Sequence, residues 1–142
     1  MHASAQQTTP SRRTIVVHTL ATALVFQGLS GIVGGIGLVM DPTGATLQIP
    51  IEWLHGSPFD SYLIPGWILL VVLGIGPLVA LGGLLRDRPW AKRASLAVGV
   101  ALVGWIGVEI AVIGYHAQPP LQLVYGGLGV VIVGLALRLR NG

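Results

Sequence analysis

Four long apolar stretches, separated by polar connections, dominate the sequence. Their approximate bounds are residues 14–40, 61–85, 94–115 and 121–137. A helix needs about 20 residues to cross a hydrocarbon core of about 30 Å, and each stretch meets this length, although the fourth is short. Because backbone polar groups in lipid must be hydrogen-bonded within their own segment, the pattern predicts four transmembrane helices.

The connections indicate how these helices are arranged. Those over residues 86–93 and 116–120 are short, so consecutive helices are expected to lie antiparallel. The predicted fold is therefore all-α, an integral membrane up-down four-helix bundle over residues 14–139. Residues 1–13 are mostly small and polar without a periodic pattern, which predicts a disordered cytoplasmic tail before the bundle.

The connection over residues 41–61 is long enough to hold structure of its own. It opens with Asp-Pro-Thr-Gly at 41–44, the residue order of a tight turn. Apolar alternation over 47–51 is compatible with an extended piece, whereas Pro50 is also suited to begin a short helix that continues to Leu54. We expect a short interfacial segment between the first two helices, lying along the outer membrane surface or capping the bundle.

The basic residues fall at one end of this arrangement. All eight Lys and Arg residues flank the start of the first stretch, the connection between the second and third, or the end of the fourth; they are Arg12, Arg13, Arg86, Arg88, Lys92, Arg93, Arg138 and Arg140. The other two connections contain none. By the positive-inside rule, this distribution predicts a multi-pass protein of the plasma (inner) membrane with both termini in the cytoplasm.

Composition supports a membrane protein and excludes several other classes. The chain of 142 residues is 53% hydrophobic and 9% charged, whereas soluble domains carry about 25% charged residues. The basic residues flank apolar stretches instead of covering one polar face, so we expect contacts with membrane lipids and no binding of nucleic acid. The absence of Cys excludes disulfides and Cys-ligated metal centres. No cofactor motif is present, and none is expected.

Glycine is abundant within the apolar stretches. Of 21 glycines, Gly31 and Gly35 have GxxxG spacing in the first stretch. Small residues let helix backbones approach closely in lipid, where apolar burial gives little driving force. Two interpretations follow: these glycines pack the helices of one bundle, or they form the contact of a homodimer.

Two further residues bear on helix geometry. Pro77 lies inside the second stretch and lacks the N–H that would bond the Leu73 carbonyl, so a kink is expected there. Gln27 lies inside the first stretch, where its amide is expected to donate a hydrogen bond to another helix.

Glu109 is the acidic residue placed within a predicted span. A charge at mid-membrane costs at least about 2.5–3.5 kcal/mol, so such residues usually face the protein interior and carry function. Glu109 lies in the outer third of its span, so a structural role near interfacial water remains open.

Other polar residues belong to the same end of the predicted bundle. The candidate polar or ligand site consists of Glu109, His116, Asp60, His55, Glu52 and Asp41. Such a cluster is suited to relay protons, bind a divalent cation or accept a cationic ligand. A solvated acidic surface is the simpler interpretation. No pair of these residues has metal-ligand spacing on one helix, so no metal is expected.

Three segments carry a family resemblance. Residues 41–44, 57–66 and 105–115 resemble those of small four-helix membrane proteins of prokaryotes, a family that brings no established activity, and the similarity covers most of residues 20–137. The layout is also similar to that of DoxX-like proteins in size and number of spans.

The sequence leaves three function hypotheses. The first is a non-enzymatic structural or accessory subunit that forms a homo-oligomer or binds a membrane protein partner. The alternative is a small transporter or proton-coupled carrier that uses Glu109, with His116 and Asp60 guiding ligands at the outer mouth. A lipid-modifying enzyme is a third, less supported class, because no nucleophile–base pair is evident.

Overall fold

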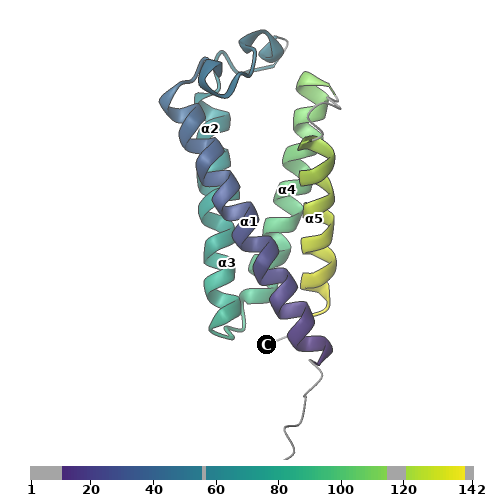
Figure 1. The fold of residues 1–142 in the computed structure, drawn as a ribbon. Helices are drawn as coiled ribbons and strands as arrows, with labels where there is room; N and C mark the ends of the chain where they lie inside the picture. The colour runs from purple at the N-terminus through teal and green to yellow at the C-terminus, as the bar shows by residue number, and fades with distance from the viewer. Residues whose placement is uncertain (1–10, 56, 115–120, 140–142) are drawn as a thin grey trace, which may run out of the picture.

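Four helices make up the described part of the chain, which covers residues 11–55, 57–114 and 121–139 of a computed structural model (Figure 1). They are α1 (Arg12–Met40), a second helix from Leu63 to Leu85, α4 (Ala91–Ile113) and α5 (Leu121–Leu137). The second helix is divided into α2 (Leu63–Leu70), the π-helical η3 (Val71–Ile75) and α3 (Gly76–Leu85). The described residues contain no β-strand, and the all-α prediction is confirmed.

The first helix starts two residues before the expected span. The Ser11 hydroxyl caps it by accepting a hydrogen bond from the Thr14 amide at 3.1 Å. Arg12 and Arg13 are therefore helical and are not part of a tail, because the cap satisfies a backbone donor of the first turn. Residues 1–10, the remainder of the expected tail, lie outside the described residues.

Three of the helices are long and apolar enough to cross a membrane, namely those over Arg12–Met40, Leu63–Leu85 and Ala91–Val112. The fourth, α5, is apolar but has 17 residues. Large apolar side chains project from the outer faces of the bundle; Val33 is 69% exposed and Leu123 is 64% exposed. This surface is compatible with a lipid surrounding and unlike that of a water-soluble domain.

The π-helical segment η3 lies directly before Pro77. A proline cannot donate to the carbonyl four residues earlier, and its ring crowds that turn. In η3 the Gly76 amide bonds the Val71 carbonyl, five residues back, so the backbone widens where the proline interrupts the α-helical pattern. A kink is expected from the sequence at Pro77, and the structure has a π-helical turn directly before it.

A side chain from α1 contacts this interrupted turn. The Gln27 amide donates to the Leu73 carbonyl at 3.0 Å, and Gln27 is buried. Leu73 is the residue whose carbonyl an α-helical N–H at position 77 would bond, and Pro77 has no N–H. The expected interhelical hydrogen bond is confirmed, and its acceptor is the carbonyl that the proline leaves without its α-helical donor.

Gly31 and Gly35 allow α1 to approach the backbone of the second helix closely enough for this hydrogen bond. A Cβ at Gly31 would overlap the Leu73 carbonyl, and one at Gly35 would lie 2.6 Å from the Leu70 Cα. Both glycines are buried against the second helix of the same chain. Their face is therefore occupied within the bundle and is not available for the homodimer contact considered from the sequence.

The other two helices pair in the same way. A Cβ at Gly99 of α4 would lie 2.9 Å from the Val133 amide nitrogen and 3.1 Å from the Gly129 carbonyl oxygen of α5. The stacked rings of Phe26 and Tyr125, with centroids 5.9 Å apart, link α1 to α5. The bundle thus consists of two closely packed halves, α1 with α2–η3–α3, and α4 with α5.

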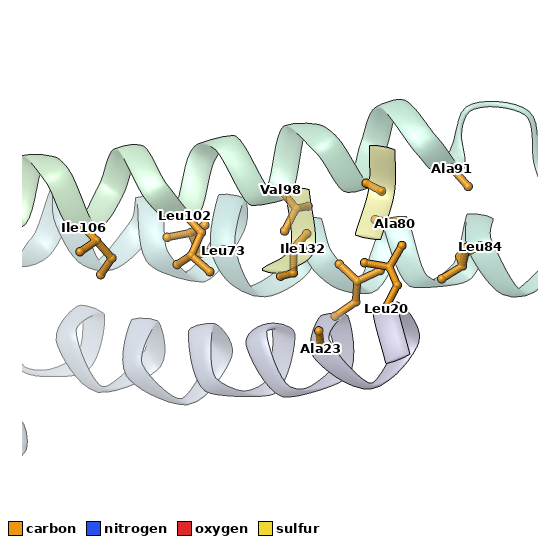
Figure 2. Close-up of a cluster of buried hydrophobic side chains, with 12 residues drawn as sticks. Leu20, Ala23, Leu73, Ala80, Leu84, Ala91, Val98, Leu102, Ile106 and Ile132 are labelled. Atoms are coloured by element: carbon orange, nitrogen blue, oxygen red, sulfur yellow. The ribbon is translucent and has the colours of Figure 1, made fainter. Parts of the chain in front are cut away.

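One apolar core joins the halves (Figure 2). It is formed by side chains from α1, η3, α3, α4 and α5: Leu20, Ala23, Leu24, Leu73, Ala80, Leu84, Ala91, Val98, Leu102, Ile106, Ile132 and Ala136. The start of α1, the α3–α4 connection and the end of α5 lie at the same end of the bundle, and α2 and α4 diverge toward the other (Figure 1). We call these the basic end and the acidic end, after the charged residues that each carries.

The connection from α1 to α2 covers the acidic end. It contains two short 3₁₀ helices, η1 (Ala45–Leu47) and η2 (Ile51–Leu54), and Pro50 precedes the second. The short-helix interpretation of this segment is confirmed, whereas the extended one is wrong. Gly44 has a φ of +80°, and its amide bonds the Asp41 carbonyl at 3.0 Å, which closes the turn at the end of α1.

Replacing Gly31 with alanine tests the close approach of α1 to η3. Gly31→Ala places a methyl group against the Leu73 backbone, which is rigid, so we expect a loss of about 1–3 kcal/mol in the free energy of unfolding. Thermal unfolding in detergent, followed by circular dichroism, measures this loss.

Gly104→Ala is the matched control, because a Cβ at Gly104 of α4 meets no atom within 4 Å. Alanine there is expected to raise stability by up to about 1 kcal/mol through its better helix propensity. Equal effects of the two substitutions would contradict the packing described for α1.

Candidate binding cavity

A cavity of about 320 Å³ lies at the acidic end, where the two halves of the bundle diverge. Its walls come from α1, the 41–62 connection, α2, α4 and α5. Most of the lining is apolar: Leu38, Leu47, Ile49, Trp53, Leu54, Phe59, Pro65, Leu69, Trp105, Val108, Val112 and Leu121. Val108 is 57% exposed and Leu121 is 53% exposed, so the cavity reaches the protein surface.

The position of the cavity follows from how the halves are packed. The buried core that joins them extends along α4 only as far as Ile106. Beyond it, a smaller buried group of Leu38, Leu54 and Tyr62 belongs to α1 and the connection alone. With no core side chains joining α2 to α4 at this height, the space between the halves remains as a cavity.

Glu109 is the acidic residue that lines this cavity. It lies on α4 one turn beyond Trp105, which also lines the cavity and is half-buried. The Gln122 amide of α5 donates to Glu109 Oε1 at 3.4 Å and to the Gly114 carbonyl at 3.0 Å. Gln122 is only 4% exposed, so this amide ties the two helices together behind the carboxylate.

Tyr62 closes the opposite wall. Its ring packs over Gly44, and its hydroxyl donates to the Pro50 carbonyl at 2.7 Å. Burial raises the pKa of Tyr62, and the negative charges of Glu109 and Glu52 raise it further. The phenol therefore stays neutral at physiological pH and keeps its hydrogen bond to the connection.

Asp41, a member of the candidate cluster, has a structural role in its own turn. Its Oδ1 accepts from the Thr43 hydroxyl at 2.6 Å, and its Oδ2 accepts from the Thr46 hydroxyl at 2.7 Å and from the Thr46 amide at 2.9 Å. These hydrogen bonds lower the pKa of Asp41 to about 2. Its oxygens are thus committed to holding the connection against the end of α1.

The other described candidates are not part of the cavity wall. Glu52, His55 and Asp60 are exposed on the connection, and His116 lies outside the described residues. Among residues 11–55, 57–114 and 121–139, no group of three His, Cys, Asp or Glu side chains is placed to hold a metal ion. The cluster expected from the sequence therefore contributes one described residue, Glu109, to the cavity.

Gln122 is a polar residue of the cavity that the candidate cluster omits, as are Gln48 and Tyr62. A signal for Gln122 exists in the sequence. Glu109 and Gln122 lie on either side of the short connection between two antiparallel helices, which brings them to a similar height in the bundle. Which faces of the two helices meet depends on packing, so the contact itself could not be predicted.

Comparison of the chain with protein-family models, curated proteins and solved structures gave no match. The resemblance to small four-helix prokaryotic membrane proteins stays a prediction, and the cavity is the feature of the protein that bears on its function.

Acidification is expected to loosen the connection through Asp41. A carboxylate whose pKa falls from 3.8 to about 2 on folding stabilises the fold fully above pH 3.8, and this contribution is lost as the pH falls through about 2. Protection of the Thr46 amide from hydrogen exchange, measured relative to its intrinsic exchange rate at each pH, should therefore fall between pH 4 and 2. Asp41→Asn should lack this pH dependence. If the variant shows the same pH dependence as the unmodified protein, another titrating group is its cause.

Proposed function

We propose that this chain is a non-enzymatic integral membrane protein that binds a small, mainly apolar molecule with a cationic or hydrogen-bond-donating group. The observation that carries the proposal is the Glu109 carboxylate in the wall of an otherwise largely apolar cavity. Ligand sites typically combine apolar walls with a few placed polar groups. An acidic side chain at membrane depth usually faces the protein interior and carries function, which favours a role for Glu109 in ligand binding.

Aromatic side chains support the choice of a cationic group. Trp53, Phe59 and Trp105 line the cavity together with Glu109. Aromatic faces attract cations, most strongly where water is excluded. An amphipathic amine has both features that these walls select.

The membrane setting has its own support. Three helices have the length and hydropathy of membrane spans, and α5 is apolar although short. In the described residues all Lys and Arg side chains belong to the basic end, whereas Asp41, Glu52 and Asp60 belong to the acidic end. By the positive-inside rule, we place the basic end and both termini in the cytoplasm, and the cavity in the outer half of the plasma (inner) membrane.

A carrier function is the second candidate. Glu109 is suited to bind a proton and a cationic ligand in turn, because each of them neutralises the charge of a carboxylate in an apolar wall. Transport would require the two halves to part at the basic end, where Leu20 and Leu84 of one half and Ala91 of the other belong to one buried core. In the proposal of a binding or accessory subunit this core stays closed, and the exposed apolar helix faces contact lipid, a second copy or a partner protein.

Labelling of introduced cysteines tests the membrane setting. The chain has no Cys, so Asp60→Cys and Arg86→Cys each provide a unique thiol at opposite ends. A membrane-impermeant maleimide should label Asp60→Cys in intact cells and Arg86→Cys only after permeabilisation. Labelling of both without permeabilisation, or recovery of the protein in buffer without detergent, would contradict insertion.

Binding of an amine and of the matching alcohol tests the role of Glu109. We expect Glu109→Gln to weaken the affinity for octylamine about tenfold, because a charge-assisted interaction is lost, and to leave the affinity for octanol unchanged. Quenching of tryptophan fluorescence in the purified protein measures both, since Trp53 and Trp105 line the cavity.

Asp60→Asn is the control of equal charge change, because Asp60 is exposed and lies outside the cavity wall. An equal loss in both variants would assign the amine to the acidic surface and contradict the cavity proposal. Efflux of octylamine from proteoliposomes then separates the two candidates: efflux that disappears in Glu109→Gln identifies a carrier, and binding without efflux identifies a binding protein.

A further inference from the structure

A second hollow, of about 240 Å³, lies at the basic end of the bundle. It is formed by the first turns of α1, the connection between α3 and α4, and the first turn of α4. Its polar lining consists of Arg13, Thr14, His18, Asp87, Arg88 and Lys92. The cavity that contains Glu109 shares none of these residues, so the two sites are separate.

The charge of this hollow is positive. Arg13, Arg88 and Lys92 contribute three positive charges, and Asp87 contributes one negative charge, so these four side chains have a net charge of +2. Arg13 donates to Asp87 Oδ1 at 2.8 Å, so one guanidinium is held at the edge by an ion pair. A concave surface with excess guanidinium and ammonium groups favours an anion with several acceptor oxygens.

The backbone that carries these residues is ordered by its own hydrogen bonds. The Arg88 amide bonds the Gly83 carbonyl at 2.8 Å, and the Ala91 amide bonds the Arg88 carbonyl at 3.1 Å. Asp87 has a φ of +54°, a left-handed conformation that Asp tolerates better than most residues. Two structured elements, α1 and the connection, therefore hold the cations around one space.

The rest of the wall is apolar and comprises Val17, Leu84 and Leu139 together with Pro89 and Ala91. An anion with an attached hydrocarbon chain would place its charged group against the cations and its chain beside these residues. A small soluble anion would use only the charged part. The presence of basic and apolar side chains in one lining thus favours an anionic lipid over a free ion.

We propose that this hollow binds a phosphate group, supplied by the headgroup of an anionic phospholipid. Phosphate matches the bidentate geometry of arginine and the point charge of lysine, and anionic lipids are concentrated in the cytoplasmic leaflet. The choice of a lipid rests on the proposed membrane insertion, whereas the recognition of phosphate does not.

Native mass spectrometry in a neutral detergent tests the site with phosphatidylglycerol and with zwitterionic phosphatidylcholine. The double variant Arg88→Gln/Lys92→Gln should bind phosphatidylglycerol about tenfold more weakly than the unmodified protein, because two charge-assisted contacts are lost. Phosphatidylcholine binding should not change. The control Arg86→Gln/Arg93→Gln removes the same charge from the same end, outside the hollow, and should retain phosphatidylglycerol binding.

Equal loss in the two double variants would assign the lipid to diffuse charge attraction and overturn the site, and so would no loss in either. Lys92→Arg should retain binding, which separates lost recognition from misfolding of the double variant. Competition by inorganic phosphate distinguishes the sources: displacement of the lipid at millimolar concentration would identify a soluble phosphate compound as the ligand. Failure of the octylamine experiment at Glu109 would leave these outcomes unaffected.

Discussion

The close approach of α1 to the π-helical turn of the second helix is the contact on which the arrangement of this bundle depends. Pro77 deprives the Leu73 carbonyl of its α-helical donor, and the buried Gln27 amide donates to it instead. This bond forms only because Gly31 has no side chain where the Leu73 backbone passes. In an apolar surrounding an unbonded carbonyl would be costly, so the proline, the glutamine and the glycine act as one unit.

That unit is one of the two helix contacts that determine where the bundle is closely packed and where a cavity remains. It fixes α1 to the second helix, and the pair Gly99 and Gly129 fixes α4 to α5, so the bundle is built from two tight halves. The halves meet through an apolar core that extends from the basic end as far as Ile106 of α4, and the cavity lies beyond it. At that end α2 and α4 diverge (Figure 1). Both proposed sites lie beyond the ends of the buried core. The apolar cavity with Glu109 is at the acidic end, and the hollow lined by basic side chains is at the basic end.

The candidate site was predictable in part. Glu109 was identified because a carboxylate inside an apolar stretch is unusual, and this argument needs no tertiary structure. Its neighbours were not identified, because the shared end of the bundle does not distinguish residues that line a cavity from exposed ones such as Asp60, or from Asp41, whose oxygens hold their own turn. Gln122 and Tyr62 enter the cavity wall through contacts between helices and connection that periodicity does not encode.

From the sequence alone followed the four helices, their antiparallel order, the separation of charges between the two ends, a disturbance of the helix at Pro77, and an interhelical hydrogen bond from Gln27. These features depend on local hydropathy, on connection length and on the covalent structure of proline, all of which are readable along the chain. Tertiary structure was needed to show that Gly31 and Gly35 pack within the chain, that η3 is π-helical, and that the halves diverge around Glu109. Those outcomes depend on which faces of neighbouring helices fit together, a property of side-chain shapes in three dimensions.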